Sequence, residues 1–276
     1  MVLAATPIGN LGDASPRLRD ALATADVIAA EDTRRTRALA NSLGVTLRGR
    51  LVAHHEHNEA ASAAVLLDEV RAGRTVLVVS DAGMPTISDP GYRVAAAAAA
   101  ASLPVSVLPG PSAVLSALAV SGLPSDRFVF EGFLPRKAGQ RSARLTELSK
   151  EVRTMVFYEA PHRLASTLEA LGAAFGADRP AVVARELTKL HEEVIRGDLG
   201  ALHRSVTDNG ARGEIVLVVQ GVTQASGAPE DLVGDVELLI ADGSGLKDAV
   251  SAVASNHGVS KRELYASVVA ARQERE

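Results

Sequence analysis

The chain has 276 residues, enough for one large domain or two smaller ones, and its 47% hydrophobic and 22% charged residues are typical of a soluble globular protein. It contains no cysteine, which excludes disulfide bonds, a thiolate nucleophile and cysteine-ligated metals. The formal net charge of −4 argues against a surface that coats nucleic acid broadly, but it is compatible with a local basic patch. We expect a cytoplasmic protein without a signal peptide or membrane span, because the N-terminus has no basic segment and apolar runs are short.

Short apolar runs alternate with helical segments over roughly the first 120 residues. We expect strands at residues 1–5, 27–30, 51–53, 75–79 and 105–108. Ser15 and Pro16 are expected to begin the first helix, as its N-cap and its N1 proline. A helix is expected from Glu31 to Leu43, and Asn58 is expected to cap the next helix, from about Glu59 to Arg71. This alternation predicts a parallel α/β sheet.

Polar segments follow the ends of these strands, at Thr6-Pro7, Glu31-Asp32, Ser80–Gly91 and Pro109–Ser112. In parallel α/β sheets, ligands bind outside the carboxyl ends of the strands, so the four segments should meet at one crevice. No complete phosphate-binding glycine motif and no G-x-S-x-G nucleophile motif is present. The sequence therefore predicts a polar ligand site but not, on these residues alone, its reaction.

Further strands at 155–158, 181–184 and 214–219, with helices between them, predict a second α/β unit from about residue 120 to 221. A small-residue linker at 223–229 precedes two amphipathic helices between 246 and 272, with a turn at 258–260. Two short helices around such a turn are typical of helix-turn-helix modules, so nucleic-acid contact by this tail is one alternative.

Two basic segments stand out in this acidic chain. We expect the second segment to contact a polyanion, and for the first we leave phosphate contact and a solvated helix face equally open. The first comprises Arg34, Arg35 and Arg37, and the second comprises Arg136, Lys137, Arg141 and Arg144. The segment His54–Glu59 has imidazoles and carboxylates, but it lacks a metal-binding helix motif, so we expect no metal and favour substrate contact or helix capping.

Eight motifs occur in order: ATPIGNLGD, EDTRRT, HEHNE, SDAGMPTISDPG, PGPSA, FLPRK, FYEAPHR and RELTKLHEE. Together they resemble the tetrapyrrole-methylase-like superfamily, and within it the ribosomal RNA small subunit methyltransferase I branch. The resemblance covers about residues 3–221, and the tail is similar to that branch's C-terminal extension. It implies two α/β domains of the tetrapyrrole methylase type with a cofactor cleft between them, plus a small helical extension. We expect the boundaries 1–119, 120–222 and 223–276.

The resemblance also implies a homodimeric enzyme that uses S-adenosylmethionine to methylate the ribose 2′-hydroxyl of a cytidine in 16S rRNA of the small ribosomal subunit. Two alternatives stay open, a C-methyltransferase acting on a tetrapyrrole and a non-enzymatic RNA-binding assembly protein. The residues that would border the cofactor are Pro7, Asp81, Gly83, Met84, Ile87, Ser112, Ala113, Tyr158, Glu159, Ala160 and Leu187. Met84 stands where the branch leads us to expect a smaller threonine.

A general base would add to the rate gained by positioning the ribose oxygen. The candidates are Glu31, Asp32, Asp81 and Lys189, with Glu31 and Asp32 slightly favoured, because Asp81 is expected to hold the cofactor. Within the loop of 80–91, we expect residues 81–87 to meet the cofactor. Ser88–Gly91 would instead cap and begin the alanine-rich helix, which makes Asp89 a structural residue.

Overall fold

The computed structural model describes residues 1–55, 58–222, 228–257 and 259–273. Its first five strands form one sheet in the order β3-β2-β4-β1-β5, and every neighbouring pair is parallel. The predicted parallel sheet is therefore confirmed. The strands are β1 (Val2–Ala4), β2 (Val27–Ala30), β3 (Arg50–Ala53), β4 (Val76–Val79) and β5 (Ser106–Leu108).

Helices cover both faces of this sheet, because β2 and β4 are buried along their whole length and need an apolar layer on each side. One core packs α3 and α4 against the sheet, and the other packs α1 and the end of α2 against it. The helices are α1 (Pro16–Thr24), α2 (Thr33–Ser42), α3 (Glu59–Arg71) and α4 (Tyr92–Ala100), with a short 3-10 turn at Leu11–Asp13.

The expected side-chain cap is present at the start of α1 but not at the start of α3. Ser15 caps α1 as expected, since its hydroxyl accepts the N–H of Leu18 at 3.1 Å, and Pro16 is the first helical residue. Asn58 precedes α3 but does not cap it with its side chain. Its amide instead accepts the N–H of His55 and donates to the carbonyl of Ala53, so it fixes the turn before the helix.

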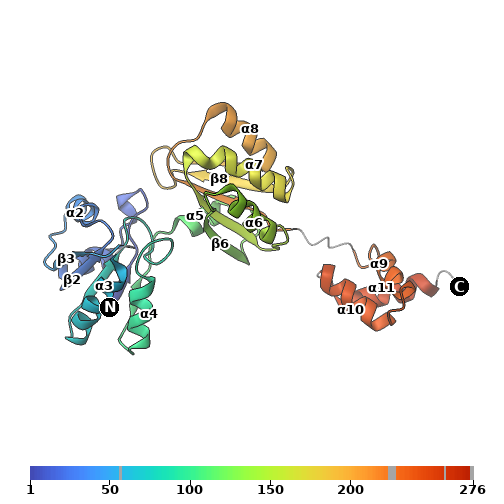
Figure 1. Ribbon diagram of the computed structural model, residues 1–276, viewed down its shortest axis with the longest axis horizontal. Coiled ribbons are helices and arrows are strands. Elements are labelled where there is room, and N and C mark those ends of the chain that lie inside the picture. Colours follow the sequence, from blue (N-terminus) through green and yellow to red (C-terminus); the bar gives the residue numbers. More distant parts are fainter. Residues whose placement is uncertain (56–57, 223–227, 258, 274–276) are drawn as a thin grey trace.

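The second sheet is mixed, in the order β6-β7-β10-β8-β9, with only the β6–β7 pair parallel. Helices α6, α7 and α8 cover one face and α5 (Ala113–Ser121) covers the other, so α5 lies between the two sheets (Figure 1). The other elements are β6 (Phe128–Phe133), α6 (Ala138–Leu148), β7 (Thr154–Glu159), a 3-10 turn (Pro161–Arg163), α7 (Leu164–Phe175), β8 (Pro180–Arg185), β9 (Glu193–Asp198), α8 (Leu199–Asn209) and β10 (Ile215–Val219).

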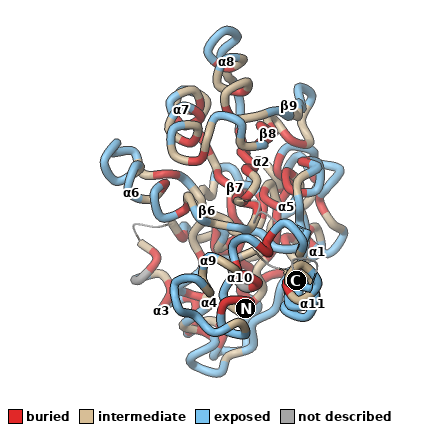
Figure 2. Tube along the Cα trace, turned by 90° about the vertical axis from the view of Figure 1, so that its right-hand side faces the viewer, coloured by how far each residue is buried: buried red, intermediate tan, exposed pale blue. Residues whose placement is uncertain are grey.

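Strand β9 was not expected from the sequence, because it is an edge strand that carries charged residues and no buried position. Figure 2 shows the buried residues concentrated around β7 and β8, with exposed outer turns on α7 and α8. The expected boundary after residue 119 falls inside α5, which packs on the second sheet, and the domain boundaries stay a prediction.

The C-terminal part contains α9 (Val233–Ala241), α10 (Leu246–His257) and α11 (Lys261–Gln273), which share an apolar core of their own. The two expected helices of the tail are thus present, and α9 joins them. Residues 223–227 of the linker expected at 223–229 and the turn residue Gly258 lie outside the described residues. No helix in the described ranges is both long and apolar enough to cross a bilayer.

Candidate functional site

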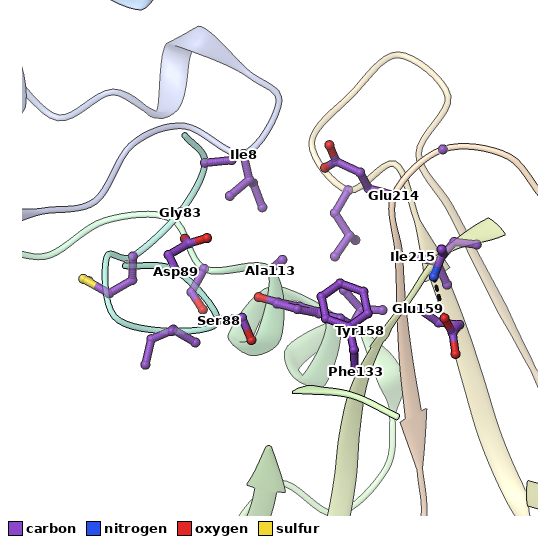
Figure 3. Close-up of a pocket in the computed structure, with 18 of the residues that line it drawn as sticks. Ile8, Gly83, Ser88, Asp89, Ala113, Phe133, Tyr158, Glu159, Glu214 and Ile215 are labelled. Carbon is purple, nitrogen blue, oxygen red and sulfur yellow. Dashed lines mark hydrogen bonds between the residues drawn. The ribbon is translucent and has the colours of Figure 1, made fainter. Parts of the chain in front are cut away.

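A cavity of about 440 Å³ opens where the strand ends of the first sheet face the second sheet. Its volume lies in the range of small-molecule sites. Figure 3 shows Ile8, Gly83 and Asp89 on one side, Glu214 and Ile215 on the other, and Tyr158 between them. The wall is formed by Ile8, Ala82, Gly83, Met84, Ile87, Ser88, Asp89, Ser112, Ala113, Phe133, Tyr158, Glu159, Ala160, Pro161, Leu187, Gly213, Glu214, Ile215 and Val216.

The loop after β4 supplies the largest part of the wall and is anchored to the loop after β1. Thr6 and Gly83 exchange two backbone hydrogen bonds, at 2.9 and 3.1 Å, in an isolated antiparallel bridge. Ser80 donates its hydroxyl to the carbonyl of Gly83 at 3.0 Å. Further along, Thr86 and Ser88 have positive φ values of 78° and 60°, a conformation that non-glycine residues rarely adopt. Such strain persists where the surrounding structure imposes it, and it is concentrated at ligand sites.

The helix after this loop is not capped as expected. The Glu59 carboxylate, which is buried at the start of α3, accepts the N–H groups of Gly91 and Arg93 at 3.0 and 3.1 Å. Asp89 lies in the cavity wall instead, and the expectation that it is a capping residue is wrong. Glu59 can take the capping role because α3 and α4 pack side by side, a tertiary contact that the local sequence does not reveal.

Three carboxyl groups gather at the first-sheet side of the cavity. Asp89 has its pKa raised from 3.8 to about 7, because it is half-buried and lies near the charges of Glu31 and Asp81, although a hydrogen bond from Ser80 opposes the shift. Burial and the Asp81 charge also raise the pKa of Glu31. The carboxyl group of Asp89 can therefore exchange a proton near neutral pH.

Asp81, like Glu31, belongs to this cluster but is not one of the residues that line the cavity. Its carboxylate accepts the backbone N–H of Asp32 at 3.0 Å and pairs with the guanidinium of Arg35 at 3.3 Å. It thereby ties the end of β4 to the start of α2. Pro7 is also absent from the wall, where the neighbouring Ile8 takes its place, whereas the other residues expected to border a cofactor are all present in it.

Two of the four candidate bases are held in forms that do not accept protons at neutral pH. Asp32 caps α2 through the N–H of Arg34 at 2.8 Å, and hydrogen bonds from Arg34 lower its pKa to about 2. Lys189 pairs with Glu186 at 3.0 Å and Glu214 at 3.2 Å. Burial lowers the pKa of Lys189, but these two partners outweigh it and the net shift is upward, so the ammonium is retained.

The second-sheet side of the wall is fixed by hydrogen bonds within its own turn. Glu159, which is buried, accepts the N–H of Ala160 at 2.8 Å and the hydroxyl of Thr167 at 2.6 Å, and it lies 3.3 Å from Arg163. Its carboxylate is thus occupied in shaping the wall. Tyr158 has its pKa raised to about 12 by burial and by the charges of Asp89 and Glu214, so its hydroxyl stays neutral.

The basic residues singled out from the sequence divide into paired and exposed groups. Arg34 and Arg35 pair with Asp32 and Asp81, and Arg144 pairs with Glu131 and Glu147 at 2.6 and 2.7 Å. The remaining four have no ion pair within the described structure. Among them Arg37, Arg136 and Lys137 are exposed, and Arg141 is half-buried.

The histidine-rich segment is only partly described, since Glu56 and His57 lie outside the described residues. His54 is buried beside Ser62, with its Nδ1 atom 2.7 Å from the hydroxyl, and burial lowers its pKa. In the described part of the chain, no group of three or more histidines and carboxylates is placed to hold a metal ion.

Sequence reasoning missed several wall residues, among them Ile8, Asp89, Phe133 and Glu214. Ile8, Asp89 and Phe133 do lie within motifs that the sequence singled out. Glu214 was assigned to a strand and has no local polar signal. It reaches the wall because β10 begins there, antiparallel to β7 and β8.

The comparisons with known proteins agree with this geometry. The family model of the tetrapyrrole (corrin/porphyrin) methylases matches residues 1–203. The ribosomal RNA small subunit methyltransferase I of Mycobacterium tuberculosis is 51% identical over 275 residues, covering 99% of this chain and 96% of that protein.

Solved structures share the fold. The methyltransferase CobJ covers 80% of this chain and 94% of its own, with a TM-score of 0.59 and 24% identity. A uroporphyrin-III C-methyltransferase from Thermus thermophilus, in complex with S-adenosyl homocysteine, covers 79% of this chain and 95% of its own, with a TM-score of 0.55 and 17% identity. The chain therefore belongs to the tetrapyrrole methylase family and, within it, to the family of ribosomal RNA small subunit methyltransferase I.

Proposed function

We propose that the protein transfers a methyl group from S-adenosylmethionine to the ribose 2′-hydroxyl of a cytidine in 16S rRNA of the small ribosomal subunit. The ribosomal RNA relatives support this substrate, because they match nearly the whole chain, whereas the tetrapyrrole-related structures match at 24% identity or less. Membership of a methyltransferase family argues against a purely structural RNA-binding protein.

The observation that carries the proposal is the charge of the cavity wall. As far as the chain is described, the wall contains Asp89, Glu159 and Glu214 but no lysine, arginine or histidine. A phosphate-bearing cofactor would be repelled there, since phosphates are bound by cations and clustered backbone donors. S-adenosylmethionine carries a positively charged sulfur and no phosphate, so the residues present fit it.

When bound, S-adenosylmethionine supplies an electrophilic methyl group. We assign Gly83, Met84 and Ile87 to its methionine end and Leu187 to its adenine, with Ser112, Ala113, Tyr158 and Ala160 completing the contact surface. Pro7 and Asp81 support this site from behind the wall. Met84 lines the cavity, so its larger side chain narrows the methionine end.

Among the candidate bases, we assign proton abstraction to Glu31. It lies beside Asp81 and Asp89, and its raised pKa brings it closer to the pH at which it works. The proton of the ribose hydroxyl moves to the Glu31 carboxylate as the oxygen gains the methyl group. Ionised Asp89 stabilises positive charge in the cavity, and Asp32 and Lys189 keep the surrounding loops in place.

The RNA backbone would meet the exposed cations Arg37, Arg136 and Lys137. The C-terminal helices offer a second surface, a groove lined by Lys247, Val250, Ser251, Lys261, Arg262 and Tyr265. We place the donor cavity between domains 1–119 and 120–222 and assign the helices after residue 223 to RNA binding. An rRNA substrate implies a cytoplasmic enzyme.

We also propose a homodimer. The edge strand β5 and the helix α5 expose large apolar side chains, among them Val107 at 46% and Leu115 at 56%. Apolar residues gathered on neighbouring elements are typical of protein interfaces. Sedimentation equilibrium should give twice the mass of one chain, and a monomer at assay concentration would contradict the proposal.

Ribose-methylation mapping tests the function directly. 16S rRNA from cells that lack the gene should lose one cytidine 2′-O-methyl mark, and the intact gene should restore it. A Glu31→Gln copy serves as the matched control, because it should leave the mark absent while the protein is present. Retention of every mark in the gene-deleted cells would contradict the proposal, as would failure of the purified protein to bind S-adenosylmethionine by calorimetry.

A further inference from the structure

Three aromatic side chains meet at one edge of the cavity, although the chain has only five phenylalanines, three tyrosines and no tryptophan. The ring of Tyr158 lies 5.0 Å from Phe130, edge to face at 69°, and 5.6 Å from Phe133 at 59°. Figure 3 shows Phe133 beside Tyr158 at the cavity. Such pairs hold their rings in defined positions.

A β-bulge in β6 is responsible for this cluster. Phe130 pairs with Val156, but the register then shifts, so that Gly132 pairs with Phe157 and Phe133 pairs with Tyr158. In an unbroken strand the alternation of side chains would place Phe133 on the face opposite to Phe130. The extra residue, Glu131, turns Phe133 onto the same face as Tyr158, and bulges are frequent beside active sites for this reason.

The bulge is stabilised by the backbone conformation of Gly132 and by hydrogen bonds to the side chain of Glu131. Gly132 has a φ of 63°, a conformation that glycine adopts at no steric cost. The carboxylate of Glu131 accepts two hydrogen bonds from the guanidinium of Arg144, at 3.0 and 2.6 Å, which ties β6 to α6. The local backbone is therefore built to hold Phe133 at the cavity.

Phe133 itself is 56% exposed, in contrast to Phe130 and Tyr158 behind it, which are half-buried. A large apolar ring that is fixed, exposed and part of a cavity wall offers a stacking surface. Two exposed cations, Arg136 and Lys137, follow three and four residues later. This combination of an aromatic face and nearby cations is typical of sites that bind single-stranded nucleic acid.

We propose that Phe133 is the platform on which the base of the target cytidine stacks while its ribose occupies the cavity. Tyr158 and Phe130 support the ring from behind, and Arg136 and Lys137 hold the adjoining phosphates. The inference rests on the proposed function, since it requires an RNA substrate. A nucleotide that reaches an enclosed site must leave its own base stack, and an aromatic side chain compensates for the lost stacking.

Two other groups would also contact the ring of Phe133 if they were bound there. The adenine of S-adenosylmethionine is also a flat aromatic group, and a second copy of the chain could cover the exposed phenyl ring in a dimer. The three occupants predict different losses when Phe133 is changed, namely RNA turnover, cofactor affinity and oligomeric state. The test therefore measures all three.

The substrate is the 30S subunit isolated from cells that lack this gene, with the variants Phe133→Ala, Phe133→Leu and Phe133→Tyr. Phe128→Ala is the matched control, because Phe128 is a 36% exposed phenylalanine of the same strand that does not line the cavity. Ala and Leu at position 133 should lower kcat/KM for the 30S subunit by roughly 5- to 150-fold, the effect of one stacked base. Tyr and Phe128→Ala should leave it near the wild-type value.

Calorimetric affinity for S-adenosylmethionine and the sedimentation coefficient should not change in any of these variants. An unchanged kcat/KM in Phe133→Ala would overturn the proposal, and so would full activity in Phe133→Leu, which keeps apolar bulk without a ring. Weaker binding of S-adenosylmethionine would instead show that Phe133 contacts the adenine. Dissociation of the dimer into monomers would show that Phe133 lies in the dimer interface. If the wild-type protein binds the cofactor but does not methylate the 30S subunit, the proposed function fails first and the stacking role falls with it.

Discussion

The side chain of Asp81 and the backbone of Asp32 are joined by a hydrogen bond of 3.0 Å, so the ends of two neighbouring strands are locked together behind the cavity. Arg35 pairs with the same carboxylate at 3.3 Å. This arrangement leaves Glu31, the residue before Asp32, beside Asp89 and Asp81 without the cap and ion pair that occupy Asp32. Adjacent acidic residues thereby acquire different chemistry.

That difference yields the first prediction. Glu31→Gln should lower the single-turnover rate of methylation by about 10²- to 10⁴-fold, the usual contribution of a general base. Asp32→Asn is the matched control, because asparagine is an equally good N-cap and the rate should stay near the wild-type value. Equal rates in the two variants, with cofactor bound, would remove Glu31 from this role.

The second prediction concerns stability and pH. In the folded protein the pKa of Asp89 is raised from 3.8 to about 7, so between these pH values the folded state binds more protons than the unfolded chain. The contribution of the protonated Asp89 carboxyl to the stability of the folded state is fully present below about pH 4 and is lost as the pH rises through about 7. Asp89→Asn should therefore stabilise the free protein at pH 8 more than at pH 5, measured by urea denaturation. The same increment at both pH values would contradict this.

The ionised form of Asp89 should also favour a cationic cofactor, which gives a third prediction. The affinity for S-adenosylmethionine should rise with pH through the titration of Asp89, and Asp89→Asn should flatten that rise. Calorimetry at a series of pH values, with the neutral product-like ligand S-adenosylhomocysteine for comparison, separates charge from shape. A rise of the same size for both ligands would not be due to the sulfonium charge.

A fourth prediction follows from the cap of α4. Glu59→Ala leaves the buried N–H group of Gly91 and the partly buried N–H group of Arg93 without their acceptor, which should cost about 1–3 kcal/mol of unfolding free energy. Glu59→Gln keeps an acceptor oxygen and should lose less. Urea denaturation measures both. Equal losses would show that the negative charge, and not the hydrogen bonds, accounts for the stabilisation.

The fifth prediction tests the C-terminal groove. Lys261→Ala combined with Arg262→Ala should weaken binding of the 30S subunit and reduce the slope of log affinity against log salt concentration by about 1–2 units, since each phosphate contact contributes about one. Lys150→Ala removes an exposed cation elsewhere on the surface and is the control. An unchanged salt slope in the double variant would exclude phosphate contact at this groove.

Local patterns were sufficient for the first sheet and much of the cavity wall. The apolar runs of β2 and β4 are buried throughout, and the polar segments after β1, β4 and β5 do converge, as parallel topology requires. The motif resemblance placed Tyr158, Glu159 and Leu187 in the same wall, although they follow strands of a different sheet. Cofactor binding by these residues stays a prediction.

The parts that sequence reasoning missed depend on contacts between distant segments. The local sequence predicted that Asp89 caps α4. The residue that accepts the first N–H groups of α4 is Glu59, which lies on another helix and could not be found from local sequence. Phe133 lies at the cavity because a bulge in β6 turns its side chain to the other face of the strand. A local sequence pattern does not show such a register shift. Likewise, the burial and charges that distinguish Glu31 from Asp32 come from tertiary neighbours.

Ile8 has a consequence for how the cavity opens. It follows β1 of the first sheet, yet it is 7% exposed and packs in one apolar cluster with Val114, Leu187 and Val216 against the second sheet. A hinge motion that separated the sheets would pull Ile8 out of this cluster and expose it to water. Entry to the cavity should therefore depend on loop movements, and amide hydrogens on both sides of the cluster should exchange as a single cooperative unit.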